Sequence, residues 1–489
     1  MSEVARRQRA FAILTGVACC LVLASLLFWV KRHPFSIGWD ESEYVNQAYD
    51  DVAAFHRHTV RSLAVALLRD VPGRPSAYRM FAAPLTLLLG PGVNVTRLSS
   101  IMLLAVTLLF IYATAKRMAG PVAAAIATIF VASSSGVVSA THEFGTEGPL
   151  FLATAMLLYF VLNPDEPWWG LGVALGIGAL SKATFALIAG PILLWEVWKR
   201  PRTTLKAVAL GTAIALPWWA LNFRSAVEYA NYASHFYRHS GLEPWITALG
   251  RLALGWPLAA LVLVAALRRR WPWRQLLIPT LGTLPIFLAQ WVSVNHNMRY
   301  LAPAMLPLGL SIAILLADRS RKVLAVAGVL LLAQVALVSY GLLFPKPDIH
   351  AWDWNQVREL CRSRGIQKPT VSYLGGAWAL NPPQMAQPWL QRGEKVQVQK
   401  LWRLEDGTIN LPAVLKAAEV SDVVITLEDY RGDLANREDV DNQHDAEFAG
   451  WLEKRSEFTS PVRLVLGEEA KVLVFFRAAA DQDKGVLVK

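Results

Sequence analysis

Charged residues are scarce in this chain. Only 17% of its 489 residues are Asp, Glu, Lys or Arg, while 54% are hydrophobic and the mean hydropathy is +0.35. Soluble proteins carry charge on about a quarter of their residues. The scarcity of charge argues against a soluble protein and predicts a multi-spanning α-helical membrane protein.

Cysteine is scarcer still, with three in the whole chain. Cys19 and Cys20 are neighbours in the first apolar run, and Cys361 stands alone in the polar C-terminal part. This count predicts neither a disulfide framework nor a structural zinc site. The spaced glycines of a dinucleotide-binding loop are also missing, so we interpret Gly375-Gly376 as a turn.

The positive charge of the chain does not indicate nucleic acid. The formal net charge is +11, but the basic residues gather in short clusters between apolar runs. The positive-inside rule leads to this pattern at the cytoplasmic ends of membrane spans. The pattern therefore predicts the orientation of the chain in the membrane and does not indicate a nucleic-acid partner.

Runs of apolar residues long enough to cross a bilayer recur along the first 344 positions. We treat the first run as a retained anchor, because it is about as long as a spanning helix and no clear cleavage site follows it. About eleven spans are predicted, at residues 10–30, 97–115, 119–138, 148–162, 168–181, 183–198, 205–221, 251–267, 275–293, 300–317 and 321–343.

The basic clusters predict the topology of these spans. The N-terminus is expected in the cytoplasm, and most of the later cytoplasmic turns are basic. The acidic turn 163–167 is the exception, which the rule tolerates because acids carry little weight. A large loop, 31–96, then faces outward, and its apolar pieces Val60–Leu68 and Met80–Leu89 are predicted to be helices at the membrane interface.

The last part of the chain has a different pattern. Short β-rich apolar runs alternate with helical patterns, which predicts a soluble α/β domain on the outer side of the membrane. The predicted domains are thus a transmembrane domain, 1–344, and an extracytoplasmic α/β domain, 345–489. The predicted strands lie at residues 370–374, 396–398, 422–427 and 471–476.

Three carboxylates cluster at the start of the large outer loop, in Asp40-Glu41-Ser42-Glu43-Tyr44. Asp40 and Glu43 have the spacing of a helix-capping arrangement, which would explain both as structural residues. That leaves Glu41 unexplained. It also leaves Tyr44, one helical turn after Asp40, with its phenol on the same face as the Asp40 carboxylate.

Several motifs in this order resemble a known family. Asp40-Glu41-x-x-Tyr44 after a first span resembles the D-E-x-x-Y motif of protein O-mannosyltransferase-like (glycosyltransferase family 39-type) and aminoarabinose-transferase-like enzymes, in the glycosyltransferase C superfamily. The later matches are Arg74-Pro75-Ser76-Ala77-Tyr78, Arg97-Leu98-Ser99, Thr146-Glu147-Gly148-Pro149, Gly176 to Lys182, Pro217-Trp218-Trp219, and Arg299-Tyr300 with Pro303 and Pro307.

The resemblance implies an inverting glycosyltransferase that takes a sugar from a polyprenyl-phosphate carrier. It implies that Asp40 is the base, with Glu41 and Glu147 as helpers. Substrate contacts are then expected from Tyr44, Arg74, Arg79, Lys182, Arg299 and Tyr300. Two positions depart from the family pattern: Arg74 replaces the usual Lys, and Glu147 replaces an Asp, which lengthens the carboxylate by one methylene.

Carboxylate oxygens suit Mg²⁺ or Mn²⁺, so a divalent cation is a further hypothesis. The candidate ligands of this cation are Asp40 and Glu147, and His142, in the same loop as Glu147, is a further candidate. The aromatic residues within 222–250 would suit stacking on a sugar, although an interfacial aromatic belt explains them better.

Alternatives from other classes are a transporter or flippase and a non-catalytic scaffold. The sparse cysteines favour a bacterial protein of the inner membrane. The expected acceptor is a lipid, a glycan or a protein. The sequence leaves the sugar and the choice among these acceptors open.

Overall fold

The computed structural model describes most of the chain, in two compact units. The first unit comprises 1–32, 57–90 and 94–345, and the second comprises 33–56, 91–93 and 346–489. The described residues are 3–58, 60–69, 73–235, 255–267, 272–292, 298–345, 351–377, 379–401, 404–405, 408–409, 411–428, 445–467 and 471–478.

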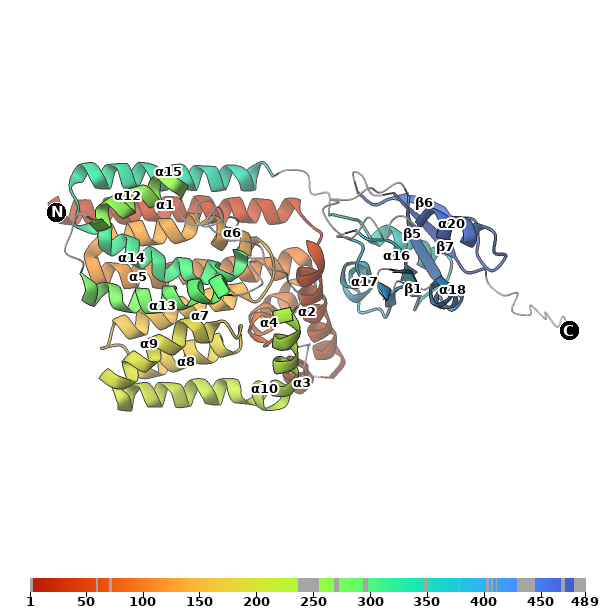
Figure 1. Cartoon of the computed structure of the whole chain (residues 1–489), viewed down its shortest axis with the longest axis horizontal. Helices are drawn as coiled ribbons and strands as arrows, with labels where there is room; N and C mark the ends of the chain where they lie inside the picture. The colour runs from red at the N-terminus through yellow and green to blue at the C-terminus, as the bar shows by residue number, and fades with distance from the viewer. Residues whose placement is uncertain are drawn as a thin grey trace. The chain divides into compact units, whose positions relative to one another are not determined.

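The first unit is built from helices (Figure 1), and each predicted span coincides with one or more of them over most of its described residues. The span predicted at 119–138 is divided between α5 and α6. Two 3-10 turns, η2 and η3, precede the regular helix in the segment predicted at 300–317, and Pro303 lies in the second of them. The elements are α1 (Glu3–Arg32), α3 (Val60–Leu68), α4 (Ala77–Leu89), α5 (Val93–Ser133), α6 (Ser135–His142), α7 (Glu147–Leu162), α8 (Trp168–Ala179), α9 (Phe185–Lys199), α10 (Pro201–His235), α12 (Gly255–Leu267), α13 (Trp273–Val292), η2 (Met298–Tyr300), η3 (Ala302–Ala304), α14 (Met305–Ala317) and α15 (Arg321–Leu343).

Four helices among the described residues are long and apolar enough to cross a membrane, which supports an integral membrane protein. They are α1, α5, α10 and α15. Shorter apolar helices such as α7 and α8 lie between them along the chain. The predicted count of about eleven spans stays a prediction.

The long helix α5 contains a sharp break between two of the predicted spans. Gly120 has a φ of 82°, a left-handed conformation that favours glycine, and Pro121 follows it at the start of the next helical run. A proline suits the first turn of a helix because that N–H would lack an intrahelical partner. The predicted boundary between 97–115 and 119–138 is therefore confirmed.

Three of the turns predicted to face the cytoplasm lie together, near Arg117, Glu166 and Arg200. Arg117, beside the break in α5, forms an ion pair with Glu166 at 2.5 Å. Arg200, which precedes α10, donates to the carbonyl of Val161 near the same turn, at 3.1 Å. The acidic turn 163–167 thus lies with the basic turns, as the topology predicts.

Glycines allow α8 and α10 to pack closely. A Cβ on Gly172 would lie 3.0 Å from the backbone oxygen of Ala207, and one on Gly211 would lie 2.6 Å from the Cβ of Leu175. Small residues let helix backbones approach in apolar surroundings, where packing rather than hydrophobicity holds helices together. This contact fixes the helix that ends just before Lys182.

The second unit contains a five-stranded mixed sheet, in the order β2-β1-β5-β7-β6. Strand β1 pairs in parallel with β2 and β5, and β7 is antiparallel to β5 and β6. All four predicted strands are present, while β6 of this sheet and the short strands β3 and β4, which pair with each other, were missed. The elements are α2 (Gly38–His58), α16 (Asn355–Ser363), β1 (Thr370–Tyr373), α17 (Pro382–Leu390), β2 (Gln397–Lys400), β3 (Leu404–Glu405), β4 (Thr408–Ile409), α18 (Leu411–Glu419), β5 (Val423–Glu428), α20 (Asp445–Glu453), β6 (Val462–Val465) and β7 (Lys471–Phe476).

Both faces of this sheet are covered. One core joins Val423 and Ile425 of β5 to Trp389 of α17, and a second core joins Val424 of the same strand to Phe448 of α20. Successive residues of a strand point to opposite faces, so a continuous apolar run such as β5 needs cover on each side. The α/β pattern read from the sequence is thus present.

A buried arginine of the second unit is held by two carboxylates. Arg358 of α16 is fully buried, and its Nε and Nη2 donate to the two oxygens of Glu394 at 2.8 and 2.6 Å. Its Nη1 also donates to Glu359 at 2.5 Å. The hydrogen bond from Arg358 holds the pKa of Glu394 below its ordinary value.

This pair predicts a pH-dependent loss of stability. Because the folded-state pKa of Glu394 is lowered, its contribution is present above the unfolded pKa of about 4.3 and is lost as pH falls through the folded pKa. We expect Glu394→Gln to destabilise the unit by about 1–3 kcal/mol at pH 7 and by less at acidic pH.

The measurement is limited proteolysis of the full chain across a urea series at both pH values. Glu359→Gln is the matched control: it removes a carboxylate from the same arginine, but that side chain is 55% exposed. Equal sensitivity of the two variants would contradict the prediction.

Candidate functional site

The predicted residues of the first unit converge at one end of the bundle. Glu147 begins α7 and is only 5% exposed. Its Oε1 lies 2.7 Å from the Nζ of Lys182, and its Oε2 accepts a hydrogen bond from Thr146 at 3.2 Å. A buried carboxylate with a cation at this distance forms a strong, oriented pair.

Aromatic and cationic groups complete this cluster. The Nζ of Lys182 lies 4.2 Å from the ring centroid of Tyr300, and the Cζ of Arg299 lies 5.7 Å from the same centroid. Arg299 is also close enough to act electrostatically on Glu147. Glu147, Lys182, Arg299 and Tyr300, here called the Glu147 cluster, are therefore brought together in the structure, and their roles toward a substrate stay predictions.

The segment that carries Arg74 reaches the same region through the backbone. The N–H of Ala77 donates to the carbonyl of Leu180 at 2.9 Å, just before Lys182. The ring of Tyr78 contacts Phe144 edge-on, with centroids 5.6 Å apart, and Phe144 lies three residues before Glu147. The start of α4 thus packs against two of the loops that carry the cluster.

The two arginines of this segment have protein partners. Arg74 donates to the phenol of Tyr229 at 3.3 Å, with its Cζ 5.4 Å from the centroid of that ring. Arg79 is 1% exposed and donates to the carbonyl of Ala66 in α3 at 2.6 Å. Arg79 therefore ties α4 to α3, and its predicted contact with substrate stays a prediction.

His142, the third candidate metal ligand, lies against a tryptophan. Its ring stacks on Trp29 of α1 with centroids 4.3 Å apart and an interplanar angle of 20°. The buried Arg97 lies 5.0 Å from the centroid of Trp29. The sequence did not point to Trp29, because nothing distinguishes it from the other tryptophans of an apolar chain.

The acidic motif forms the start of α2 in the second unit. Asp40 is half-buried, while Glu41 is 1% and Tyr44 is 7% exposed. The Oε2 of Glu41 accepts from the N–H of Ile37 at 2.6 Å, so Glu41 makes the helix-end contact that the sequence had suggested for Asp40 and Glu43. Glu43 accepts from Gln47 at 3.4 Å.

Asp40 and Tyr44 lie one helical turn apart, as expected from their spacing. They belong to a different compact unit from Glu147, so the hypothesis that Asp40 and Glu147 share one site stays a prediction. The aromatic residues at 237, 239 and 245, considered as sugar contacts, lie outside the described residues.

A bound cation was a further hypothesis. Within the described residues, no group of three or more His, Cys, Asp or Glu is arranged to hold a metal ion. Glu147 is engaged by Lys182 and His142 by Trp29. Metal dependence stays a prediction.

Residues 74–221 match the dolichyl-phosphate-mannose-protein mannosyltransferase family. The chain is also 26% identical over 290 residues to an undecaprenyl phosphate-alpha-4-amino-4-deoxy-L-arabinose arabinosyl transferase of Pseudomonas paraeruginosa, covering 51% of this chain and 52% of that protein. The same enzyme of Pseudomonas aeruginosa is 25% identical over 292 residues. The chain thus matches about half the length of these curated relatives.

Among solved structures, ArnT from Cupriavidus metallidurans in the apo state has a TM-score of 0.65 at 14% identity, covering 95% of this chain and 97% of that one. The chain has the ArnT fold. Arabinofuranosyltransferase AftD from Mycobacteria has a TM-score of 0.60 at 17% identity, covering 97% of this chain and 40% of that one. The resemblance to O-mannosyltransferase-like and aminoarabinose-transferase-like enzymes, predicted from the ordered motifs, is confirmed.

The ion pair between Glu147 and Lys182 predicts a specific coupling. Glu147→Gln and Lys182→Met should each destabilise the protein by about 1–3 kcal/mol, because each leaves a buried charge without its partner. This is less than the loss of a fully buried pair, since Lys182 is 20% exposed. The double variant should recover most of the loss.

The measurement is the thermal unfolding midpoint of the purified full-length protein in detergent, for the wild type, both single variants and the double variant. Strictly additive losses would show that the two side chains are not coupled.

Proposed function

We propose that this protein is an inverting glycosyltransferase that transfers a sugar from a polyprenyl-phosphate carrier to an acceptor at the outer face of a membrane. The observation that carries the proposal is the Glu147 cluster, which gathers a carboxylate, two cations and a phenol at one end of a helix bundle. Two relatives named as undecaprenyl phosphate-alpha-4-amino-4-deoxy-L-arabinose arabinosyl transferases support it. So does the same fold in ArnT bound to undecaprenyl phosphate, with a TM-score of 0.64.

The donor phosphate suits the cations of the cluster. When the sugar leaves the carrier, negative charge develops on the phosphate oxygens, and fixed cations in a site of low polarity stabilise that charge. Lys182 and Arg299 supply two positive charges against the single carboxylate of Glu147, so the cluster keeps a net positive charge. Glu147 holds the Lys182 ammonium in place, which reduces its reorganisation during the reaction.

The acceptor requires a base. The acceptor oxygen attacks the anomeric carbon of the sugar, the bond from that carbon to the phosphate oxygen breaks, and Asp40 takes the acceptor proton. Polyprenyl phosphate leaves as the anion. Glu41 acts through its hydrogen bond to Ile37, which fixes the first turn of α2 and hence the direction of Asp40.

The proposal includes a location and an arrangement of domains. The protein would lie in a bacterial inner membrane, with residues 1–344 as the transmembrane domain, its N-terminus in the cytoplasm, and the C-terminal domain 345–489 outside. The acceptor would be a lipid, a glycan or a protein. A transporter or flippase is not favoured, since the relatives are named as transferases.

The first variant to make is Asp40→Asn, which keeps the size of the side chain but removes the base. Transfer should fall by about 10²–10⁴-fold, the usual contribution of general base catalysis. The assay is transfer of labelled sugar from lipid extracts in proteoliposomes, with yield and melting temperature as checks on folding. Glu43→Gln, three positions along the same helix, is the matched control, and full activity of Asp40→Asn would refute the role of Asp40.

A second variant tests whether Arg299 contacts the donor phosphate or acts only through the overall positive charge of the protein surface. Arg299→Met should lower kcat/KM for the lipid-linked donor by about 10²–10³-fold if its cation faces the departing phosphate. Arg224→Met, which removes a cation whose side chain is 94% exposed on α10, is the control and should have little effect. Equal effects would mean that the arginines act only through surface charge.

The proposed function as a whole is tested in cells that lack the protein. Mass spectrometry of the lipid fraction should detect accumulation of a polyprenyl-phosphate sugar and loss of the modified acceptor. An unchanged lipid-linked pool would overturn the proposal.

A further inference from the structure

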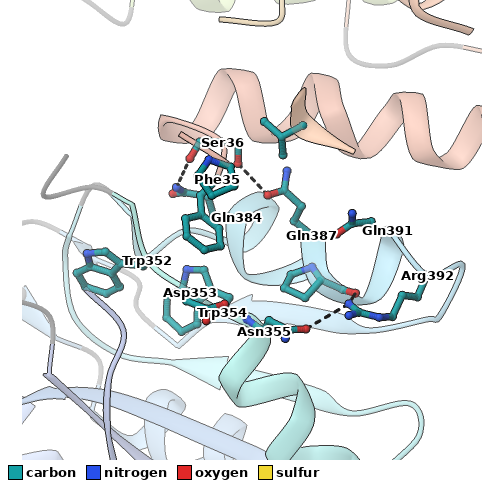
Figure 2. A pocket seen from close by; sticks show the side chains of 13 residues that line it. Phe35, Ser36, Trp352, Asp353, Trp354, Asn355, Gln384, Gln387, Gln391 and Arg392 are labelled. Carbon is teal, nitrogen blue, oxygen red and sulfur yellow. Dashed lines mark hydrogen bonds between the residues drawn. The ribbon is translucent and has the colours of Figure 1, made fainter. Parts of the chain in front are cut away.

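A pocket of about 290 Å³ lies within the second unit (Figure 2). One wall is the segment Pro34–Ser36, which leads into α2, and the other walls come from residues 352–355 and from α17 with the residues that follow it. Its volume is just below the range of about 300–1,000 Å³ for small-molecule sites. It therefore suits a ligand the size of one sugar ring.

The polar wall of this pocket is held in place by its own hydrogen bonds. The Oδ1 of Asp353 accepts from the N–H of Asn355 at 3.1 Å. The Oδ1 of Asn355 accepts from the Nη1 of Arg392 at 3.2 Å, and the same Nη1 donates to the carbonyl of Pro388 (Figure 2). These bonds leave the amide nitrogen of Asn355 to donate and the second oxygen of Asp353 to accept.

The remaining lining is apolar or amide in character. Phe35, Trp354 and Pro388 line the pocket together with Gln384 and Gln391. The single cation of Arg392 is balanced by the carboxylate of Asp353, so the lining carries no net charge. A neutral ring with an apolar C–H face and an edge of hydroxyl groups, each both donor and acceptor, matches this combination.

The pocket shares a wall with the segment that leads to the acidic motif. Ser36 is fully buried, its carbonyl accepts from Gln384 at 2.8 Å, and its hydroxyl donates to Gln387 at 3.1 Å (Figure 2). The same hydroxyl lies 2.7 Å from that of Ser42 in the first turns of α2. A ligand in the pocket would therefore lie beside the residues that set the start of the helix carrying Asp40.

We infer that this pocket binds a neutral sugar ring of the acceptor, so that the acceptor is a glycan. The assignment of this sugar to the acceptor rests on the proposed function. The binding of a neutral sugar ring in the pocket does not rest on it. The ring lies with one face toward Phe35 and Pro388 and its hydroxyl edge toward Asp353, Asn355 and Arg392.

Ligand-observed NMR on the full-length protein in detergent tests the binding. The probes are neutral methyl hexopyranosides and methyl pentofuranosides at millimolar concentration, with inorganic phosphate as the anionic comparison. Saturation transfer to at least one glycoside is expected. The inference would be overturned if no glycoside showed saturation transfer, or if inorganic phosphate displaced the bound glycoside.

Variants place the binding in this pocket. Asn355→Ala and Arg392→Met should each weaken glycoside binding by tenfold or more. Arg362→Met, whose side chain is 58% exposed and does not line the pocket, is the control and should bind as the wild type does. Undiminished binding by both pocket variants would mean that the sugar binds elsewhere.

The transfer assay then distinguishes the two proposals. If the pocket serves the acceptor, Asn355→Ala raises KM for a glycan acceptor and leaves the affinity for the lipid-linked donor unchanged. An unchanged KM would overturn the assignment to the acceptor. Glycoside binding by a wild-type protein that transfers no sugar would refute the proposed function and leave the sugar pocket standing.

Discussion

The ion pair between Glu147 and Lys182 is the interaction around which the site in the helical unit is arranged. Each side chain comes from a place where a helix begins or has just ended, so the pair forms only if α7, α8 and α9 hold their lengths and packing. The glycine contacts between α8 and α10 fix the helix that leads to Lys182. An error of one helical turn anywhere in this set would separate the charges, and each would then be buried alone.

Much of the fold could be predicted from local sequence patterns. Apolar length identified the helices, and the Gly120-Pro121 pair explains where one long run breaks in two. The apolar run of β5 identified a strand, and the structure places that strand at the centre of the sheet. Strand β6 was missed because its residues alternate between half-buried and exposed over only four positions, so it carries no continuous apolar signal.

The site was only partly predictable. Lys182, Arg299 and Tyr300 followed from ordered motifs, but their distances depend on tertiary packing that no spacing encodes. The contact of Glu41 with Ile37 illustrates the limit, because capping rules pointed to Asp40 and Glu43. Side chains that act through packing, such as Trp29 against His142, have no sequence signal beyond being apolar or aromatic.

The acidic motif belongs, by its contacts, to the part of the chain that follows it by some three hundred positions. Ser36 is bound by Gln384 and Gln387, and Asn46 of α2 donates to the carbonyl of Pro383 at 2.7 Å. This structural unit is therefore discontinuous in the sequence. An exchange of the C-terminal part between homologues would have to carry residues 33–56 with it, since a foreign α17 would meet the first turns of α2 with the wrong partners.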